Sequence, residues 1–254
     1  MKLLPFAFQP EGDFLEVVLT TDLHKGAMTF LPKKAEAHRK YILDSPDRKV
    51  IDMGDHCENN IRSSPGADQT CPPDEQFEWV AEYYRPMKDR LLGIVTGNHE
   101  DRTAKDAGIP ADKWLTTVLG CPWIRWEKIL SITVGDSRHG QNYTIYVRHA
   151  VSNSSKVPQI LGAMIAQRGP VQGCDVYAFA HNHMFLAEAL PTQLPDPRHG
   201  KLIERDQHFV MGDSFMARDG SYAEMKNFAL SSRGQVSLLL HKDRHQVEVK
   251  RLVY

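Results

Sequence analysis

Short apolar runs alternate with segments of helical periodicity in the first half of the chain. Runs rich in Val, Ile and Leu are typical of buried strands, and they are expected at residues 14–20, 49–53 and 91–96. Apolar residues at helical spacing predict helices at residues 33–43, 76–90 and 112–119. Pro86 is expected to interrupt the second helix. This alternation of strands and helices predicts a largely parallel sheet.

The pattern changes after residue 125. Two strand-like runs joined by a turn-rich segment predict a hairpin at residues 129–134 and 143–148. A helix and a buried strand are expected at residues 157–167 and 174–180, and further strands at 185–190, 207–211, 236–240 and 246–253. Residues 191–200 contain three prolines and a glycine and are expected to form a loop. The second half is therefore expected to add another, partly antiparallel sheet. No repeat or linker divides residues 1–254, which predicts one domain.

Composition narrows the class of protein only moderately. The 254 residues carry 31 Lys and Arg against 32 Asp and Glu, a net charge of −1, which argues against a strong sequence-independent grip on nucleic acid. No apolar run approaches the ~20 residues that a membrane span needs, and the amino-terminal run is short for a signal peptide. A cytoplasmic enzyme without a membrane partner is expected.

The cysteines do not indicate a disulfide framework. Cys57, Cys71, Cys121 and Cys174 form no Cys-x-x-Cys pair, and a chain of 254 residues does not need disulfide bonds to be stable. Four reduced thiols are expected, and a Cys57–Cys71 bridge is the alternative.

Polar clusters follow several of the apolar runs, at the point where each predicted strand ends. They are Asp22-x-His24, Gly54-Asp55, Gly97-Asn98-His99-Glu100, His149 and His181-x-His183. Ligands bind at the carboxyl ends of strands in open α/β sheets, so these side chains are expected to share one site. Alternate side chains point the same way on extended backbone, so each His-containing pair is expected to converge on one cavity.

The residue types in these clusters suit a pair of divalent cations. Carboxylate and amide oxygens with imidazole nitrogens favour manganese, and fit iron, zinc or nickel, while no thiolate is present to favour a softer metal. The two oxygens of Asp55 allow it to bridge two metals. Two metals ~3.5–4 Å apart hold a bridging hydroxide as a nucleophile for phosphorus.

The ordered set of clusters resembles the calcineurin-like metallophosphoesterase superfamily. The signature of that superfamily is Asp-x-His, Gly-Asp, Gly-Asn-His-(Asp/Glu), a lone His, then Gly-His-x-His, and the resemblance spans residues 20–183. It implies a four-layer α/β/β/α sandwich of two mixed sheets flanked by helices. One metal would be held by Asp22, His24, Asp55 and His183, and the other by Asp55, Asn98, His149 and His181. His99 would be the general acid that protonates the leaving group.

The chain departs from the signature at two positions. Ala180 stands where the family has the glycine before His-x-His, and Ala150 follows His149 where the family has a glycine. The second departure leaves His139 as an alternative to His149. His149 is preferred because it ends a predicted strand, whereas His139 lies in a predicted turn.

Charged residues near the clusters suggest further roles. In the protein-phosphatase branch of the family, the position of Glu58 holds a carboxylate paired with the histidine that matches His99, so Glu58 is expected to orient His99 and raise its pKa. The arginine that follows that carboxylate is replaced here by Asn59, which counts against a phosphoprotein phosphatase. Arg62 and Arg102 are candidates for phosphate contacts, with structural ion pairs as the alternative.

The substrate class is the least determined feature. A phosphodiester, including one within a nucleic acid, is the leading expectation, because residues 220–226 loosely resemble phage and bacterial repair-exonuclease-like members of the family. A phosphomonoesterase or a nuclease would use the same site. A non-catalytic metal-binding module and a mononuclear redox site are the competing classes. The sequence leaves the oligomeric state open.

Overall fold

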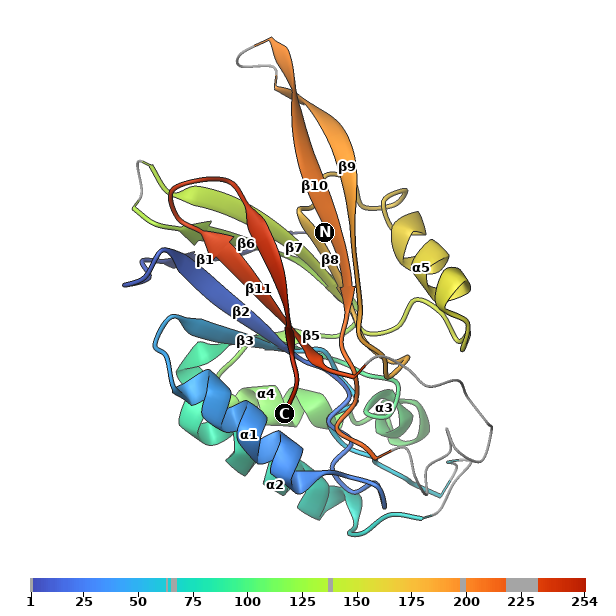
Figure 1. Cartoon of the computed structure of the whole chain (residues 1–254). Coiled ribbons are helices and arrows are strands. Elements are labelled where there is room, and N and C mark those ends of the chain that lie inside the picture. Colours follow the sequence, from blue (N-terminus) through green and yellow to red (C-terminus); the bar gives the residue numbers. More distant parts are fainter. Residues whose placement is uncertain (1, 63, 65–67, 137–138, 197–199, 218–232) are drawn as a thin grey trace.

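Two six-stranded sheets pack face to face between layers of helices (Figure 1). The computed structural model describes residues 2–62, 64, 68–136, 139–196, 200–217 and 233–254. Sheet 1 has the order β12 (Val247–Leu252), β11 (Gln235–His241), β2 (Phe14–Thr20), β3 (Arg48–Asp52), β4 (Leu91–Val95) and β5 (Trp123–Ile124). Sheet 2 has the order β1 (Leu4–Phe8), β6 (Glu127–Val134), β7 (Gln141–Arg148), β8 (Val176–Phe179), β10 (Lys201–Met211) and β9 (Leu186–Asp196).

Helices cover the outer faces of both sheets (Figure 1). Sheet 1 is covered by α1 (Pro32–Leu43), α2 (Pro73–Tyr84) and α4 (Ala111–Leu119), and sheet 2 by α5 (Val157–Ala166). A 3-10 segment, η1 (Arg85–Arg90), continues α2, and the short helix α3 is Asp101–Ala107. The predicted four-layer α/β/β/α sandwich is therefore confirmed.

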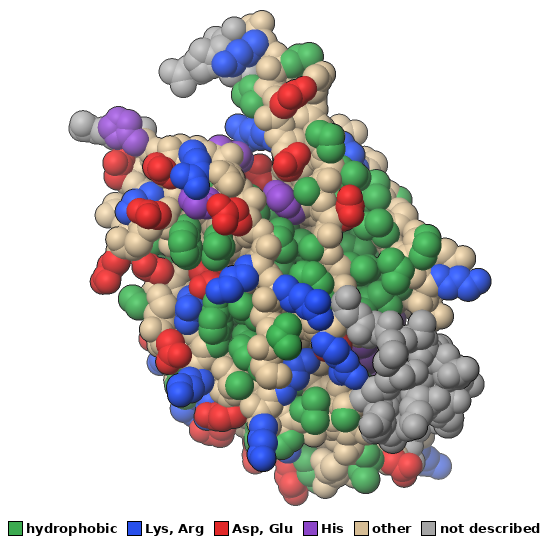
Figure 2. All heavy atoms as spheres, viewed as in Figure 1, with side chains coloured by type: hydrophobic (Ala, Val, Ile, Leu, Met, Phe, Trp, Pro, Cys, Tyr) green, Lys and Arg blue, Asp and Glu red, His purple; other side chains and the backbone are tan. Residues whose placement is uncertain are grey.

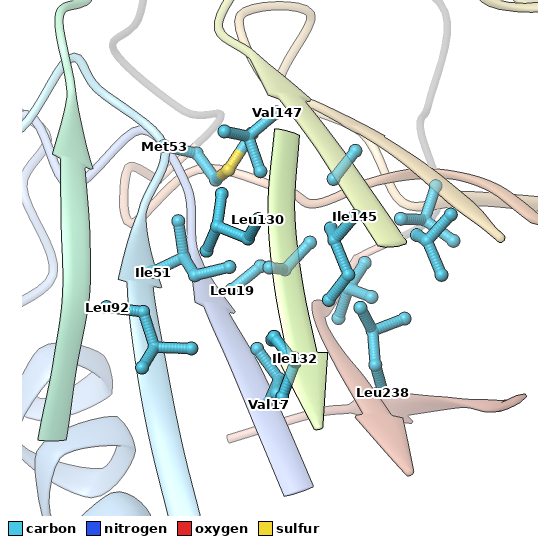
Figure 3. Close-up of a cluster of buried hydrophobic side chains, with 14 of the residues drawn as sticks. Val17, Leu19, Ile51, Met53, Leu92, Leu130, Ile132, Ile145, Val147 and Leu238 are labelled. Carbon is cyan, nitrogen blue, oxygen red and sulfur yellow. The ribbon is translucent and has the colours of Figure 1, made fainter. Parts of the chain in front are cut away.

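The main core lies between the two sheets. Val17 and Leu19 of β2 pack there against residues of sheet 2 such as Leu130 and Ile132, all of them fully buried (Figure 3). Val18, between them, instead faces the helices on the other side of sheet 1. Both faces of β2 are thus buried, because successive side chains alternate, which explains its continuous apolar run.

The two sheets are not divided between the two halves of the chain. Strands β2 to β5 form the predicted parallel sheet, but β11 and β12 extend it in antiparallel order. Conversely, β1 from the amino terminus pairs in parallel with β6 of sheet 2. The expectation that the second half builds a separate sheet was therefore wrong in detail, and the crossing strands tie the two layers into one unit.

Residues 191–196 of the predicted loop belong instead to β9, in a long hairpin with β10, and residues 197–199 lie outside the described part of the chain. Strand β9 pairs with β10 from Met211↔Leu186 out to Lys201↔Asp196, with Pro191 and Pro195 inside it. Proline lacks an N–H group, but β9 is the edge strand of its sheet, where half of the N–H groups have no ladder partner. Pro86 has the expected effect, since α2 ends at Tyr84 and a 3-10 segment follows.

The surface charges and the cysteines are as the sequence composition predicts. Lys and Arg side chains are interspersed with Asp and Glu on the face shown in Figure 2. All four cysteines are free, as expected, so the Cys57–Cys71 bridge does not form. Among the described residues, no helix is long and apolar enough to cross a membrane. Residues 220–226, which carry the loose exonuclease resemblance, lie outside the described part of the chain.

Candidate metal centre

The polar clusters meet at one edge of the sandwich, because the strands that precede them end there. Asp22 follows β2, Asp55 follows β3 and Asn98 follows β4, all in sheet 1. His149 follows β7 and His181 follows β8, in sheet 2. The candidate site therefore lies at the junction of the two sheets, and neither sheet supplies the whole set.

One group of donor atoms gathers around His24. Asp22, His24 and His183 each offer a ligand atom within 4.8 Å of the others. His24 Nε2 lies 3.1 Å from His183 Nε2, and His183 Nε2 lies 3.6 Å from Asp22 Oδ1. Asp55 Oδ2 is 3.9 Å from His24 Nε2, which links this group to the next one.

A second group gathers around Asp55 and His149. Asp55, His149 and His181 again offer atoms within 4.8 Å of one another. His149 Nε2 is 3.1 Å from Asp55 Oδ2 and 3.1 Å from Asn98 Oδ1. Asp55 thus links the two groups, since it also lies in a third group of donor atoms with His24 and His99. The structure brings together all seven residues that the sequence nominated as ligands.

In the neutral tautomers that the outer contacts favour, lone pairs converge in these groups. His149 Nδ1 lies 2.7 Å from the Met53 carbonyl oxygen, so it must donate a proton there, and Nε2 is left with a lone pair that faces Asp55. His24 Nδ1 likewise donates to Glu58 Oε2 at 3.0 Å, and its Nε2 faces His183. A bound cation satisfies such an arrangement. The oxygen and nitrogen donors therefore fit a divalent metal of the manganese, iron or zinc kind.

The charges in the site are strongly coupled. Burial alone would lower the pKa of His149, but the Asp55 carboxylate raises it to about 10. Burial raises the pKa of Asp22 to about 7, and burial together with the nearby His149 lowers that of His181 to about 4. A cation between these groups would replace the proton that His149 otherwise holds.

The candidate ligands are held in an unusual backbone conformation. Six described residues other than glycine have positive φ, and five of them are candidate ligands: Asp22, His24, Asp55, His181 and His183. Their φ angles lie between 50° and 80°. Left-handed conformations are costly for residues with a Cβ and cluster at functional sites. The turns after the strands are therefore bent to aim these side chains into one place.

Two glycines allow the loops of sheet 1 to approach each other closely. A Cβ on Gly97 would lie 2.1 Å from Asp55 Oδ1, and one on Gly54 would lie 2.7 Å from the Gly97 nitrogen. Gly97 is therefore required by the close approach to Asp55 rather than by a positive φ. The alanine at position 180 has ordinary backbone geometry, with its N–H donating to the His149 carbonyl at 2.8 Å, so a glycine is not needed there.

Glu100 braces the Asp55 loop, a role that sequence reasoning missed. Its carboxylate is fully buried and accepts hydrogen bonds from the backbone N–H groups of Asp55 at 2.9 Å, Cys57 at 3.0 Å and Gly97 at 3.1 Å. The glutamate at the end of the Gly-Asn-His-Glu motif was the available signal. By joining the loops after β3 and β4, it fixes the position of the shared carboxylate.

The structure corrects the predicted role of the Glu58 carboxylate. It pairs with His24 at 3.0 Å, whereas its nearest approach to His99 Nδ1 is 3.7 Å. His99 Nδ1 donates instead to the Glu58 backbone carbonyl at 2.6 Å. Burial lowers the pKa of His99, and the nearby Glu58 charge does not reverse this shift. The Glu58 carboxylate therefore contacts His24 more closely than His99, and its backbone carbonyl makes the shorter contact with His99.

The two arginine candidates lie in different environments. Arg102 donates to His99 Nε2 at 3.0 Å, to Asn60 Oδ1 at 2.8 Å and to the Glu58 carbonyl at 2.9 Å, so it belongs to the site. Arg62 is exposed.

Two other histidines are placed away from the donor groups. His139 has a side chain that is 84% exposed in a turn, so it is no rival to the buried His149. His56 is fully buried with its ring nitrogens 3.6 Å from Asp52 and Glu100, and with Cys57 and Glu100 it forms a separate buried group of possible ligand atoms behind the site.

Comparison with known proteins gives matches in structure only. No family model matches the chain, and no curated protein sequence matches it. Among solved structures, it is similar to Yfce, a phosphoesterase from E. coli (TM-score 0.41, 12% identity, 89% of this chain and 87% of the other). It is also similar to the calcineurin-like phosphoesterase YfkN from Bacillus subtilis (0.42, 12%, 94% and 88%) and to Vps29 from Chaetomium thermophilum (0.41, 12%, 94% and 98%).

The fold and the site together define a class. The chain is a two-sheet α/β/β/α protein with Asp, Asn and His side chains gathered where the sheets meet. A calcineurin-like phosphoesterase is among the structures it resembles. Because these TM-scores are below 0.5, the functional assignment rests on the side chains of this chain.

Proposed function

We propose that this chain is a metal-dependent phosphoester hydrolase that uses two divalent cations. The observation that carries the proposal is the position of Asp55, whose carboxylate lies between two groups of lone-pair donors. Asp22, His24, Asp55 and His183 would hold one cation, and Asp55, Asn98, His149 and His181 the other. Manganese is the favoured metal, with iron, zinc or nickel as alternatives.

A pair of such cations supplies Lewis acidity toward phosphoryl oxygens and a nucleophilic water at neutral pH. The residues of the chain do the positioning. Met53 and Glu58 fix the tautomers of His149 and His24, so that each presents an Nε2 lone pair to the centre of the site. The backbone contacts of Glu100 hold Asp55 between the two groups.

His99 is proposed to protonate the leaving group through Nε2, which would first take up a proton from solvent because that atom carries a lone pair in this structure. Its Nδ1 is held by the Glu58 carbonyl at 2.6 Å, and its Nε2 lies 4.0 Å from Asp55 Oδ2. A ring atom that close to the shared carboxylate is within reach of a phosphoryl group bound there. The side chain is 13% exposed, which gives a leaving group access to it.

A phosphodiester is the proposed substrate class, with nucleic acid as one source of it. Asn98 is exposed and His183 has 33% of its side chain exposed, so the site opens to solvent on that side. A phosphomonoester is the second candidate, since the donor groups would hold either substrate.

The test begins with metal-stripped protein that is reloaded with manganese. The metal content per chain is measured, and hydrolysis of bis(p-nitrophenyl) phosphate is compared with that of p-nitrophenyl phosphate. We expect two metals per chain and faster turnover of the diester. Faster turnover of the monoester would identify a phosphatase, and no hydrolysis of either would favour a non-catalytic metal-binding module.

Asp55→Asn gives the sharpest variant. Loss of the shared carboxylate should lower the metal content to one or none per chain and reduce kcat/KM by roughly 1000-fold or more, because both cations depend on it. Asp206→Asn, in strand β10, serves as the control. Unchanged metal content and turnover in Asp55→Asn would refute the dinuclear site.

A further inference from the structure

The Arg102 guanidinium lies inside the site, near the Glu58 carboxylate but with no direct ion pair in the described part of the chain. Among the described residues, no carboxylate oxygen approaches it within 4.0 Å; the partly buried Arg90 and Arg168 also donate only to neutral acceptors, but Arg102 is the one that contacts His99 of the site. Its three hydrogen bonds go to neutral acceptors instead. A buried or half-buried cation with no ion pair is costly unless a ligand supplies the negative charge.

The contact with His99 shows which way this cation faces. His99 Nδ1 must carry the proton that it donates to the Glu58 carbonyl, so Nε2 is an acceptor for Arg102 Nη2 at 3.0 Å. The same Nε2 lies 4.0 Å from Asp55 Oδ2. The guanidinium is therefore next to the atoms between which a substrate phosphorus would be held.

The guanidinium is also held in place from behind. Asn60 accepts one of its hydrogen bonds at 2.8 Å, and both backbone groups of Asn60 are paired with the side chain of Gln69 at 3.1 Å. Gln69 Oε1 in turn accepts from Gln76 of helix α2 at 2.8 Å. These amide contacts connect Nη1 to helix α2 and hold it in place. Nη2 has only the His99 contact, which it can exchange for a contact with an anion.

We infer that Arg102 binds a substrate phosphate oxygen that the metals do not hold, and so contributes to substrate selection. The inference rests on the proposed function. Two sources could supply that oxygen: the third non-bridging oxygen of a phosphomonoester, or the phosphate next to the scissile one in a nucleic-acid strand. In either case Nη2 passes its hydrogen bond from His99 to the substrate, which frees the His99 ring atom nearest the site.

The experiment compares manganese-loaded wild type with Arg102→Ala and Arg102→Lys on three substrates: p-nitrophenyl phosphate, bis(p-nitrophenyl) phosphate and a short oligonucleotide. A lost hydrogen bond to a charged group corresponds to roughly 10- to 100-fold. We expect Arg102→Ala to lose about that factor in kcat/KM on the monoester if the third oxygen is bound, or on the oligonucleotide if the neighbouring phosphate is bound. The simple diester, which has neither feature, should lose a smaller factor, through the contact of Arg102 with His99 alone, and Arg102→Lys should show only part of each loss.

Binding of inorganic phosphate to the manganese-loaded protein, measured by calorimetry, provides a readout that does not need turnover. Arg102→Ala should weaken it by a similar factor, while Arg85→Ala, which removes an exposed arginine paired with Glu82, should not. Equal losses on all three substrates, together with a lowered thermal midpoint, would show a purely structural role and overturn the inference. Wild-type behaviour of Arg102→Ala would overturn it alone, whereas absence of hydrolysis and phosphate binding in wild type would overturn the proposed function as well.

Discussion

Two histidines of the site are fixed by the same device but face opposite charges. His149 and His99 each donate Nδ1–H to a backbone carbonyl, that of Met53 at 2.7 Å and that of Glu58 at 2.6 Å. The Nε2 of His149 then faces the Asp55 carboxylate, and that of His99 accepts from the Arg102 guanidinium. The pKa of His149 is accordingly raised to about 10 despite burial, whereas burial lowers that of His99.

The comparison shows that the charged group next to each histidine, rather than the residue type, determines what that histidine can bind. A neutral imidazole whose lone pair points at a carboxylate is placed to share a cation with it. An imidazole whose lone pair points at a guanidinium is placed beside bound anions instead. The site thus has a negative interior around Asp55 and a positive rim at Arg102.

The largest expected effect on turnover comes from replacing His149 or His99 with alanine. His149→Ala should lose one metal per chain, and activity with it. His99→Ala should keep two metals per chain and lose about 10²- to 10⁴-fold in kcat, with the greater loss on substrates that have poor leaving groups. For both variants, the metal content per chain is measured, and kcat is compared over a series of substrates with different leaving groups. Loss of metal in His99→Ala, or full turnover on poor leaving groups, would break the distinction between the two histidines.

A smaller effect is expected from Glu58→Gln, because this carboxylate orients His24 rather than His99. Loss of an outer partner of a metal-bound histidine typically costs 10- to 100-fold in metal affinity. We expect a loss of about that size for one metal, measured by competition with a chelator, with kcat largely restored at saturating manganese. Glu78→Gln, on the exposed side of α2, is the control. A lasting kcat defect with normal metal affinity would instead support the pairing of Glu58 with His99.

The smallest effect on turnover is expected from Glu100→Gln, which changes the carboxylate that accepts hydrogen bonds from the backbone of the Asp55 loop. The amide offers one acceptor oxygen in place of two, and its NH₂ group faces backbone N–H groups. The free energy of unfolding of the metal-free protein should fall by about 1–3 kcal/mol, as measured by urea denaturation. The exposed Glu82→Gln is the matched control. Equal stability of Glu100→Gln and wild type would show that the three backbone contacts contribute little.

Much of the fold could be predicted because its strands are buried on both faces. Residues 14–20 and 91–96 read as continuous apolar runs, and their order with the helices predicts parallel pairing. The partner of β1 and the hairpin of β9 with β10 could not be predicted in this way. The first pairing joins residues far apart in the chain, and the second depends on an edge position that makes proline acceptable.

The site residues could be nominated from the sequence, but their pairing could not. Strand ends predict which side chains meet, since the parallel strands share an edge. Whether Glu58 offers His99 its carboxylate or its carbonyl depends on the path of the loop, which Gln76 sets from another element by accepting from the Asn59 N–H at 2.8 Å. Arg102 likewise reaches His99 only because α3 begins right after the motif.

The left-handed backbone at the candidate ligands also bears on how this protein could change. Each such residue costs of order 1 kcal/mol or more, and glycine would adopt the same conformation without that cost. Asp22→Gly would in addition remove a fully buried carboxylate. The same carboxylate accepts the His181 N–H at 3.0 Å, however, so the relief of backbone strain is offset by the loss of that hydrogen bond. A screen for thermal stability alone weighs backbone strain against these hydrogen bonds and takes no account of the site, so stability engineering of this scaffold has to hold these positions constant.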